Sequence, residues 1–116
     1  MSRALRITTL GTTLGMLLLA AQASAAGEQD AAKGQAVYTA QKCSVCHAIQ
    51  GKGNKANPLD GVGAKLSADD IRKWIVSPVE MTKQSASTKK PPMVAKYDKL
   101  PAADLDALVA YMSSLK

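Results

Sequence analysis

The clearest alternation of apolar and polar positions lies at the C-terminal end of the chain. One apolar face, spaced as on a helix, is formed by Leu105, Leu108, Val109, Met112 and Leu115. Pro101 fits the first turn of this helix because its φ angle is already helical. Asp104 and Asp106 near the start and Lys116 at the end each interact favourably with the helix dipole. The pattern predicts a last helix that starts near Pro101.

Two further helices are predicted before it. Ser67 can cap a helix, with Asp70 three residues later as a partner in a capping box. Pro78 should stop this helix, and its apolar face consists of Ile71, Trp74 and Ile75. A first helix is predicted over residues 31–41, with Asp30 as its N-cap.

The segments between these helices are predicted to be loops. Residues 42–66 are rich in Gly, Lys and Asn, and neither they nor residues 81–99 keep a sustained period. Pro91 and Pro92 impose extended backbone on the second loop. No strand pattern and no internal repeat competes. The fold class is therefore all-α, a small domain with three main helices.

The N-terminal residues have the pattern of an export signal. Arg3 and Arg6 precede a mostly apolar stretch over residues 7–21, and residues 23–25 supply the small side chains of a cleavage site. A membrane span needs roughly 20 apolar residues, and Gly and Thr interrupt this stretch. We expect residues 1–25 to be a cleaved secretory signal and residues 26–116 to form one domain in a bacterial periplasm, without a membrane span. A retained anchor is the alternative.

The expected mature chain has little material for a hydrophobic core. It contains no Phe, one Trp and three Tyr, and domains of this size often need an additional staple or bound group. Removal of Arg3 and Arg6 lowers the formal net charge from +6 to +4. Because no basic patch is interleaved with aromatic residues, nucleic acid is not expected as a partner.

The sequence Cys43-Ser44-Val45-Cys46-His47 is a haem-attachment motif. Two thiols three positions apart can each bond one vinyl group of a porphyrin, and the next residue then presents its imidazole to the iron. The chain has one histidine and two cysteines, all of them within this motif. We therefore predict one haem c, covalently bound through Cys43 and Cys46, with His47 as an iron ligand. The porphyrin would also complete the thin core.

Three other uses of the motif fit the sequence less well. A thioredoxin-like thiol pair needs a βαβ context, which is missing here. A structural zinc site needs four ligands, and only three candidates exist. A simple disulfide leaves His47 without a role.

A sixth iron ligand is expected to be a methionine, because no second histidine exists. Met93 is the preferred candidate, since it lies in the loop that Pro91 and Pro92 stiffen. There are two alternatives: Met93 only packs, or Met81, near the end of the second predicted helix, is the ligand. Met112 belongs to the apolar face of the last helix and is expected in the core.

Over residues 30–116 the chain resembles the class I cytochromes c. The features that carry the resemblance occur in the family's order: Gly34 and Tyr38, the attachment motif, the Asn57-Pro58-Leu59-Asp60-Gly61 segment, Trp74-Ile75, Lys90-Pro91-Pro92-Met93, and Leu108-Val109-Ala110-Tyr111.

The resemblance implies several contacts. The first and last helices should cross at Gly34, with Tyr38 and Tyr111 packed at the crossing. The carbonyl of Pro58 should accept a hydrogen bond from His47 and so orient the imidazole. Trp74 should either donate its indole N–H to a haem propionate or belong to the core.

The function expected from these features is one-electron transfer rather than catalysis. An iron with both axial positions filled, by His47 and Met93, has no place for a substrate. We expect a monomeric carrier between periplasmic or membrane redox partners, such as those of a respiratory chain. A haem subunit of a larger oxidoreductase, or a ligand sensor with a labile Met93, is the alternative.

The segment around Met93 is rich in lysine. Residues 82–90 are polar and are expected near the haem edge. The lysines of the wider region form either an ordinary solvated surface or a ring that docks acidic partners: Lys83, Lys89, Lys90, Lys96 and Lys99.

Overall fold

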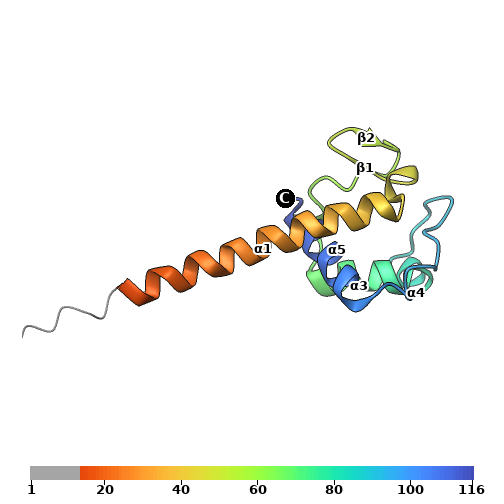
Figure 1. Cartoon of the computed structure of the whole chain (residues 1–116). Helices are drawn as coiled ribbons and strands as arrows, with labels where there is room; N and C mark the ends of the chain where they lie inside the picture. The colour runs from red at the N-terminus through yellow and green to blue at the C-terminus, as the bar shows by residue number, and fades with distance from the viewer. Residues whose placement is uncertain (1–13) are drawn as a thin grey trace, which may run out of the picture.

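The structure is a computed structural model that describes residues 14–116, with side chains from residue 27 onward. Figure 1 shows that this part of the chain is mainly helical. The helices are α1 (Leu14–Ala40), α2 (Val62–Lys65), α3 (Ala68–Val76), α4 (Pro78–Gln84) and α5 (Ala102–Ser114). The predicted all-α fold is confirmed, and α1, α3 and α5 are its three main helices.

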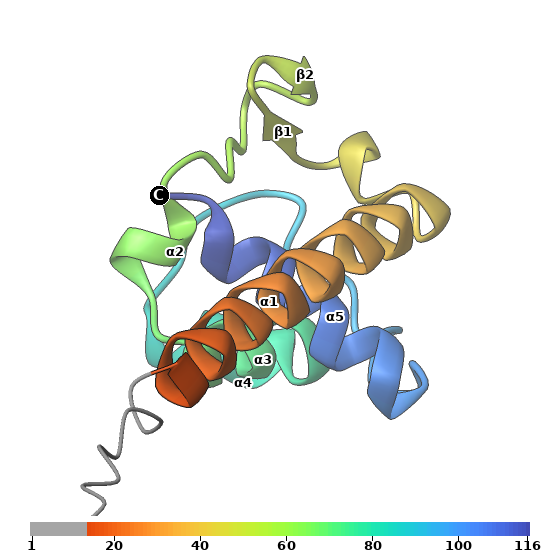
Figure 2. The ribbon, with the colours of Figure 1, turned by 60° about the vertical axis from the view of Figure 1, so that its left-hand side comes forward.

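The C-terminal half of α1 crosses α5, as Figures 1 and 2 both show. Gly34 lies at the crossing, where an added Cβ would overlap the carbonyl oxygen of Ala107 and lie 2.6 Å from the Cβ of Tyr111. The rings of Tyr38 and Tyr111 pack edge to face beside it, with centroids 6.0 Å apart. The predicted crossing at Gly34 is therefore confirmed.

The first helix begins earlier than predicted. Asp30 lies inside α1 and does not cap it, because the residues before it include many Ala and Leu, which are strong helix formers. The first half of α1 projects beyond the other helices (Figure 1). Arg3 and Arg6 lie outside the described residues, so the predicted export signal stays a prediction. None of the helices described is long and apolar enough to cross a membrane.

The hydrophobic core lies between α1, α3 and α5. Its buried side chains are Val37, Tyr38, Ile49, Ile71, Ile75, Leu108, Val109 and Met112. Leu105 and Leu115 pack against this cluster and stay partly exposed. The apolar faces predicted for the second and last helices therefore point to the core, with the exception of Trp74, which is half-buried outside the cluster.

The segment after α3 differs from the prediction. Ser67 caps α3 as expected, since its Oγ accepts a hydrogen bond of 3.1 Å from the Asp70 N–H. Pro78 ends α3 but also opens α4 at its first turn, a position where its missing N–H is not needed. Met81 is therefore helical, whereas residues 81–99 were all predicted to be loop.

The loop after the attachment motif contains a small hairpin that the sequence did not predict. Strand β1 (Ala48–Ile49) pairs antiparallel with β2 (Lys52–Gly53). Gln50 and Gly51 both have positive φ angles, as a tight two-residue hairpin turn requires. With only two residues in each strand, the hairpin has no alternating pattern long enough to be recognised.

Candidate haem site

A cavity of about 660 Å³ opens between the attachment motif, α3, α5 and the loop after α4. This volume is within the usual range for sites that bind a small molecule or cofactor. The apolar part of its wall includes Ile71 and Ile75 from α3 and Leu108 and Met112 from α5. Because these side chains also belong to the core, a group that fills the cavity would extend the core.

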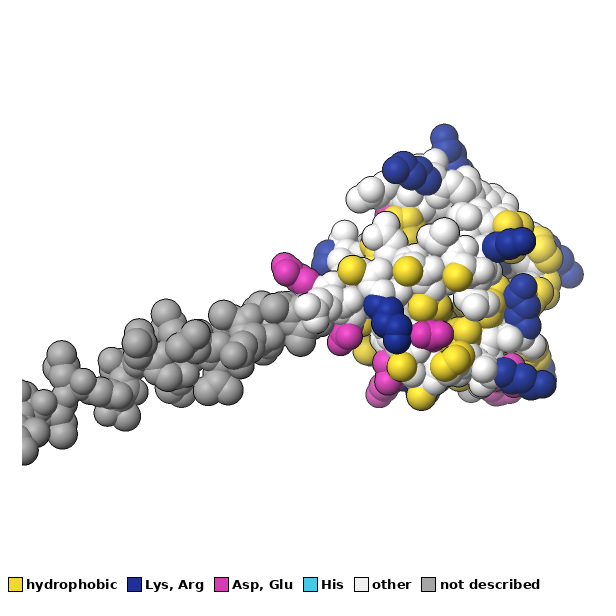
Figure 3. All heavy atoms as spheres, viewed as in Figure 1, with side chains coloured by type: hydrophobic (Ala, Val, Ile, Leu, Met, Phe, Trp, Pro, Cys, Tyr) yellow, Lys and Arg dark blue, Asp and Glu magenta, His cyan; other side chains and the backbone are white. Residues whose placement is uncertain are grey.

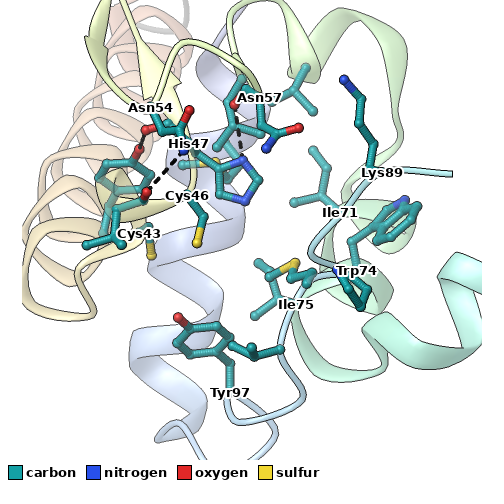
Figure 4. Close-up of a pocket in the computed structure, with 18 of the residues that line it drawn as sticks. Cys43, Cys46, His47, Asn54, Asn57, Ile71, Trp74, Ile75, Lys89 and Tyr97 are labelled. Carbon is teal, nitrogen blue, oxygen red and sulfur yellow. Dashed lines mark hydrogen bonds between the residues drawn. The ribbon is translucent and has the colours of Figure 1, made fainter. Parts of the chain in front are cut away.

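The attachment motif is folded as a tight turn on one wall of this cavity. A 3-10 turn spans Cys43–Val45, and Lys42 before it adopts a left-handed conformation with φ of 56°. The backbone N–H of His47 donates to the carbonyl of Cys43 over 3.0 Å. Figure 4 shows Cys43, Cys46 and His47 together on this wall. The two cysteines form no disulfide with each other, and burial raises the pKa of the Cys43 thiol before it bonds the haem.

The imidazole of His47 is held in a form that can bind a metal. Burial lowers its pKa, although a hydrogen bond to Asn57 opposes this effect. Nδ1 lies 3.2 Å from the carbonyl oxygen of Asn57 (Figure 4). Because a carbonyl can only accept, Nδ1 carries the proton. Nε2 therefore keeps its lone pair, as an axial ligand of iron must.

The partner of His47 is Asn57, not the predicted Pro58. Ala48 and Pro58 form a short parallel bridge, in which the Ala48 N–H donates to the Asn57 carbonyl over 3.2 Å. Successive carbonyls of an extended chain point in opposite directions. The bridge therefore turns the carbonyl of Asn57 toward the motif and that of Pro58 away from it. Pro58 itself is exposed and does not line the cavity.

Asn54 supports the motif and was not singled out in the sequence. Its backbone N–H lies 3.1 Å from the carbonyls of both Ser44 and His47, and its side-chain Nδ2 donates to Val45 over 3.4 Å. Gly53, with φ of 104°, lets the chain approach so closely that a Cβ there would overlap the His47 carbonyl. The Gly-Asn pair marks a turn in the sequence, but its contact with the motif depends on the path of the loop.

Tyr38 connects α1 to the attachment motif. Its hydroxyl donates to the backbone carbonyl of His47 over 3.4 Å. Burial is the main reason that its pKa is raised to about 12, so the hydroxyl keeps its proton at neutral pH and remains a donor. The residue therefore links the α1–α5 crossing to the backbone of the motif.

The methionines have different positions. Met93 is half-buried and lines the cavity together with Pro91 and Pro92. Met112 also lines it but is a buried core residue on α5. Met81 lies on α4 and is not among the lining residues. The structure thus brings Met93 to the same cavity as the attachment motif, and its bond to iron stays a prediction.

Trp74 and Lys89 line the part of the cavity that faces the cysteines (Figure 4). Trp74 comes from α3, and Lys89 comes from the loop after α4. The sequence predicted Trp74 either as a propionate partner or as core, and its position at the cavity fits the first role. Lys89 was expected only within the group of surface lysines.

Charges are distributed unevenly over the surface. Three cations on helices α1 and α3 form ion pairs with carboxylates: Lys33 with Asp104, Arg72 with Asp106 and Lys73 with Asp70. The cavity is lined by Lys42 and Lys89 and, among the described residues, by no Asp or Glu. Figure 3 shows Lys and Arg side chains along the upper and right-hand edges of the visible face.

These features fit a covalently bound haem, because two thiols and a neutral imidazole share one wall of an apolar cavity. No curated protein and no solved structure matches the chain. The cytochrome c family model matches residues 31–116, which cover every element of the site. Members of this family carry haem c bound through cysteine side chains, and the chain has one such pair. The protein therefore belongs to the cytochrome c family and holds haem c through Cys43 and Cys46.

Proposed function

We propose that the protein is a monohaem electron carrier whose iron is bound by His47 and Met93. The observation that carries this proposal is that Met93 lines the same cavity as the attachment motif, whereas Met81 does not. When bound, the haem supplies one-electron chemistry through its ferric and ferrous states. An electron-transfer role is general in the cytochrome c family.

The residues around the cavity support a fixed coordination. The carbonyl of Asn57 orients His47 through the hydrogen bond to Nδ1. Pro91 and Pro92 restrict the backbone before Met93, so the thioether is presented with little loss of conformational freedom. With both axial positions filled, the site has no open position for a substrate.

The described lining of the cavity also lacks the carboxylates and the second histidine that enzymes often use as acid or base. Its described lining contains no carboxylate, and the chain has a single histidine, which serves as the proximal ligand. Neither a carboxylate nor a second imidazole is therefore available as a general acid or base beside the iron. This favours a carrier over an oxidoreductase subunit with its own chemistry, and over a sensor that releases Met93.

The surface around the cavity is suited to an acidic redox partner. Val45 and Val94 line the cavity and remain 69% and 53% exposed, which gives the rim apolar contact area. Lys42 lines the same rim, and the Nζ of Lys96 lies 5.3 Å from the ring of Tyr97, another lining residue. An apolar contact surrounded by cations favours weak, oriented docking of an acidic protein.

An optical spectrum of the mature protein with one covalent haem tests the proposal. A His/Met carrier should be low-spin in both oxidation states and show the sulfur-to-iron charge-transfer band in the ferric form. Cyanide and carbon monoxide should change the spectrum only slowly. A high-spin ferric spectrum, or immediate binding of carbon monoxide, would instead support a sensor or a catalytic subunit.

We further propose that the protein works as a monomer in the bacterial periplasm after removal of residues 1–25. The charged start and the small residues at 23–25 support export and cleavage. Intact mass of the protein from the periplasmic fraction should correspond to residues 26–116 plus one haem. A mass that includes the first 25 residues, or recovery in the membrane fraction, would favour an anchored form.

A further inference from the structure

We propose that Lys89 binds a haem propionate and, through the same ammonium group, joins the loop of Met93 to the loop that orients His47. This inference rests on the proposed function and adds to it a partner for the cofactor's carboxylates. Lys89 would then belong to the haem site and not to the lysines that dock a partner.

The two ends of the cavity differ in chemistry. Figure 4 shows Cys43 and Cys46 on one side of the cavity and Trp74 and Lys89 on the other. The vinyl carbons that the cysteines bond lie on the opposite edge of the porphyrin from its two propionates. A haem attached at Cys43 and Cys46 would therefore direct its carboxylates toward Trp74 and Lys89, which would supply an indole N–H and an ammonium as donors.

The charge of Lys89 has no carboxylate partner among the described residues. The ion pairs found there involve Lys33, Arg72 and Lys73 instead. An ammonium has three N–H donors, and among the described residues Nζ makes one hydrogen bond, of 3.4 Å, to the Ala56 carbonyl. Two donors are therefore left for a carboxylate oxygen. A charge-assisted hydrogen bond of this kind is about twice as strong as a neutral one.

The hydrogen bond to Ala56 connects two segments that are 33 residues apart in sequence. Ala56 directly precedes Asn57, whose carbonyl holds the Nδ1 of His47. Lys89 precedes Met93 by four residues, and its backbone N–H donates to the Ser87 Oγ over 3.4 Å. One ammonium would thus link both ligand-bearing loops to the propionate edge of the haem.

Lys90 provides a matched control for Lys89. It has the same side chain, is also exposed, and is the next residue in the chain, but it does not line the cavity. Lys→Gln at either position removes one positive charge, so the effect of net charge is the same in both variants. A difference between variants at the two positions therefore reports on the contact with the haem.

The experiment compares mature haem-loaded wild type with Lys89→Gln, Lys90→Gln and Lys89→Arg. Reduction potentials measured across acidic and neutral pH give the apparent pKa of the propionate, while hydrogen exchange reports on residues 54–57. Lys89→Gln should raise the propionate pKa by roughly one unit, lower the potential and speed the exchange. Lys90→Gln should leave all three measurements close to wild type, and Lys89→Arg should restore them. The other titratable side chains of the lining that the haem does not use, Tyr38, Lys42 and Tyr97, are the same in every variant.

The outcome separates this inference from the proposed function. Equal titration curves for Lys89→Gln and Lys90→Gln, with a normal low-spin spectrum, would overturn the role of Lys89 and leave the carrier intact. A wild-type spectrum without the sulfur-to-iron band would contradict the carrier, whatever the titrations show.

Discussion

The α1–α5 crossing and the loop of Met93 are held in very different ways. At the crossing, Gly34 lies directly against the backbone of Ala107, and two tyrosine rings pack beside it. In the loop, most residues between Ser85 and Lys99 are exposed, and Met93 and Tyr97 are among the few that are half-buried at the cavity. The crossing is packed protein against protein, whereas the loop faces the space that the haem fills.

This difference indicates a division of roles. The crossing is the part of the domain whose packing depends least on the cofactor, and the loop depends on it most. Changes at the crossing should therefore alter stability with the haem spectrum preserved. Changes in the loop should alter coordination or reactivity with smaller effects on stability.

The largest effect is expected from removal of the haem itself, which tests whether the crossing can hold the fold alone. Without the haem, the apolar side chains that line the cavity of about 660 Å³ would be exposed to water. A typical domain has a total stability of only about 5–15 kcal/mol to offset this exposure. The Cys43→Ala/Cys46→Ala variant should therefore be largely unfolded by far-UV circular dichroism. A cooperative, native-like melt in that variant would show that the crossing suffices.

A substitution at Gly34 should break the crossing with the haem still attached. In Gly34→Ala the new methyl group overlaps the Ala107 carbonyl, which is backbone and cannot rotate away. We expect a loss of about 3 kcal/mol in the free energy of unfolding, measured with denaturant. Gly27→Ala is the control in the same helix, since nothing lies within 4 Å of its added Cβ. Gly27 would be the second residue of the mature chain, so this change should alter the free energy of unfolding by less than about 1 kcal/mol in either direction. Equal losses at both positions would disprove the close crossing.

In the loop, Met93→Ala should change the iron more than the fold. We expect loss of the sulfur-to-iron band, a high-spin or water-bound ferric iron and a lower reduction potential. The loss of unfolding free energy should be about 2 kcal/mol, less than at Gly34. Met81→Ala, also half-buried but outside the cavity, should keep the band. The reverse pattern would assign the ligand to Met81.

The smallest structural effect is expected from the lysines around the cavity. Lys42→Gln/Lys96→Gln should leave spectrum and stability unchanged but lower the association rate with an acidic redox partner by roughly threefold to tenfold at low salt. The rate should also depend less on ionic strength, because exposed charges are screened beyond about 10 Å at 0.1 M salt. Lys33→Gln/Lys116→Gln is the control, since these side chains contact Asp104 and the Gly63 carbonyl. Equal association rates in both double variants would show that the lysines form an ordinary solvated surface with no role in docking.

Local sequence patterns were sufficient to predict much of this protein. The attachment motif needs only the spacing of two cysteines and one histidine, and Ser67 caps its helix through an atom three residues away. The periodic faces of α3 and α5 follow from interactions within single turns. The cofactor, the three main helices and the crossing at Gly34 were therefore predicted correctly, the last with help from the family resemblance.

Contacts between distant segments were decided by tertiary structure alone. The short bridge between Ala48 and Pro58 places the carbonyl of Asn57 against His47. From the sequence alone, the carbonyl of the next residue, Pro58, was an equally reasonable acceptor. Lys89 reaches Ala56 across 33 residues, and no periodicity marks that pair. The physical reason is that a helix is specified by neighbours three and four residues apart, whereas a loop takes its path from whatever the rest of the fold places beside it.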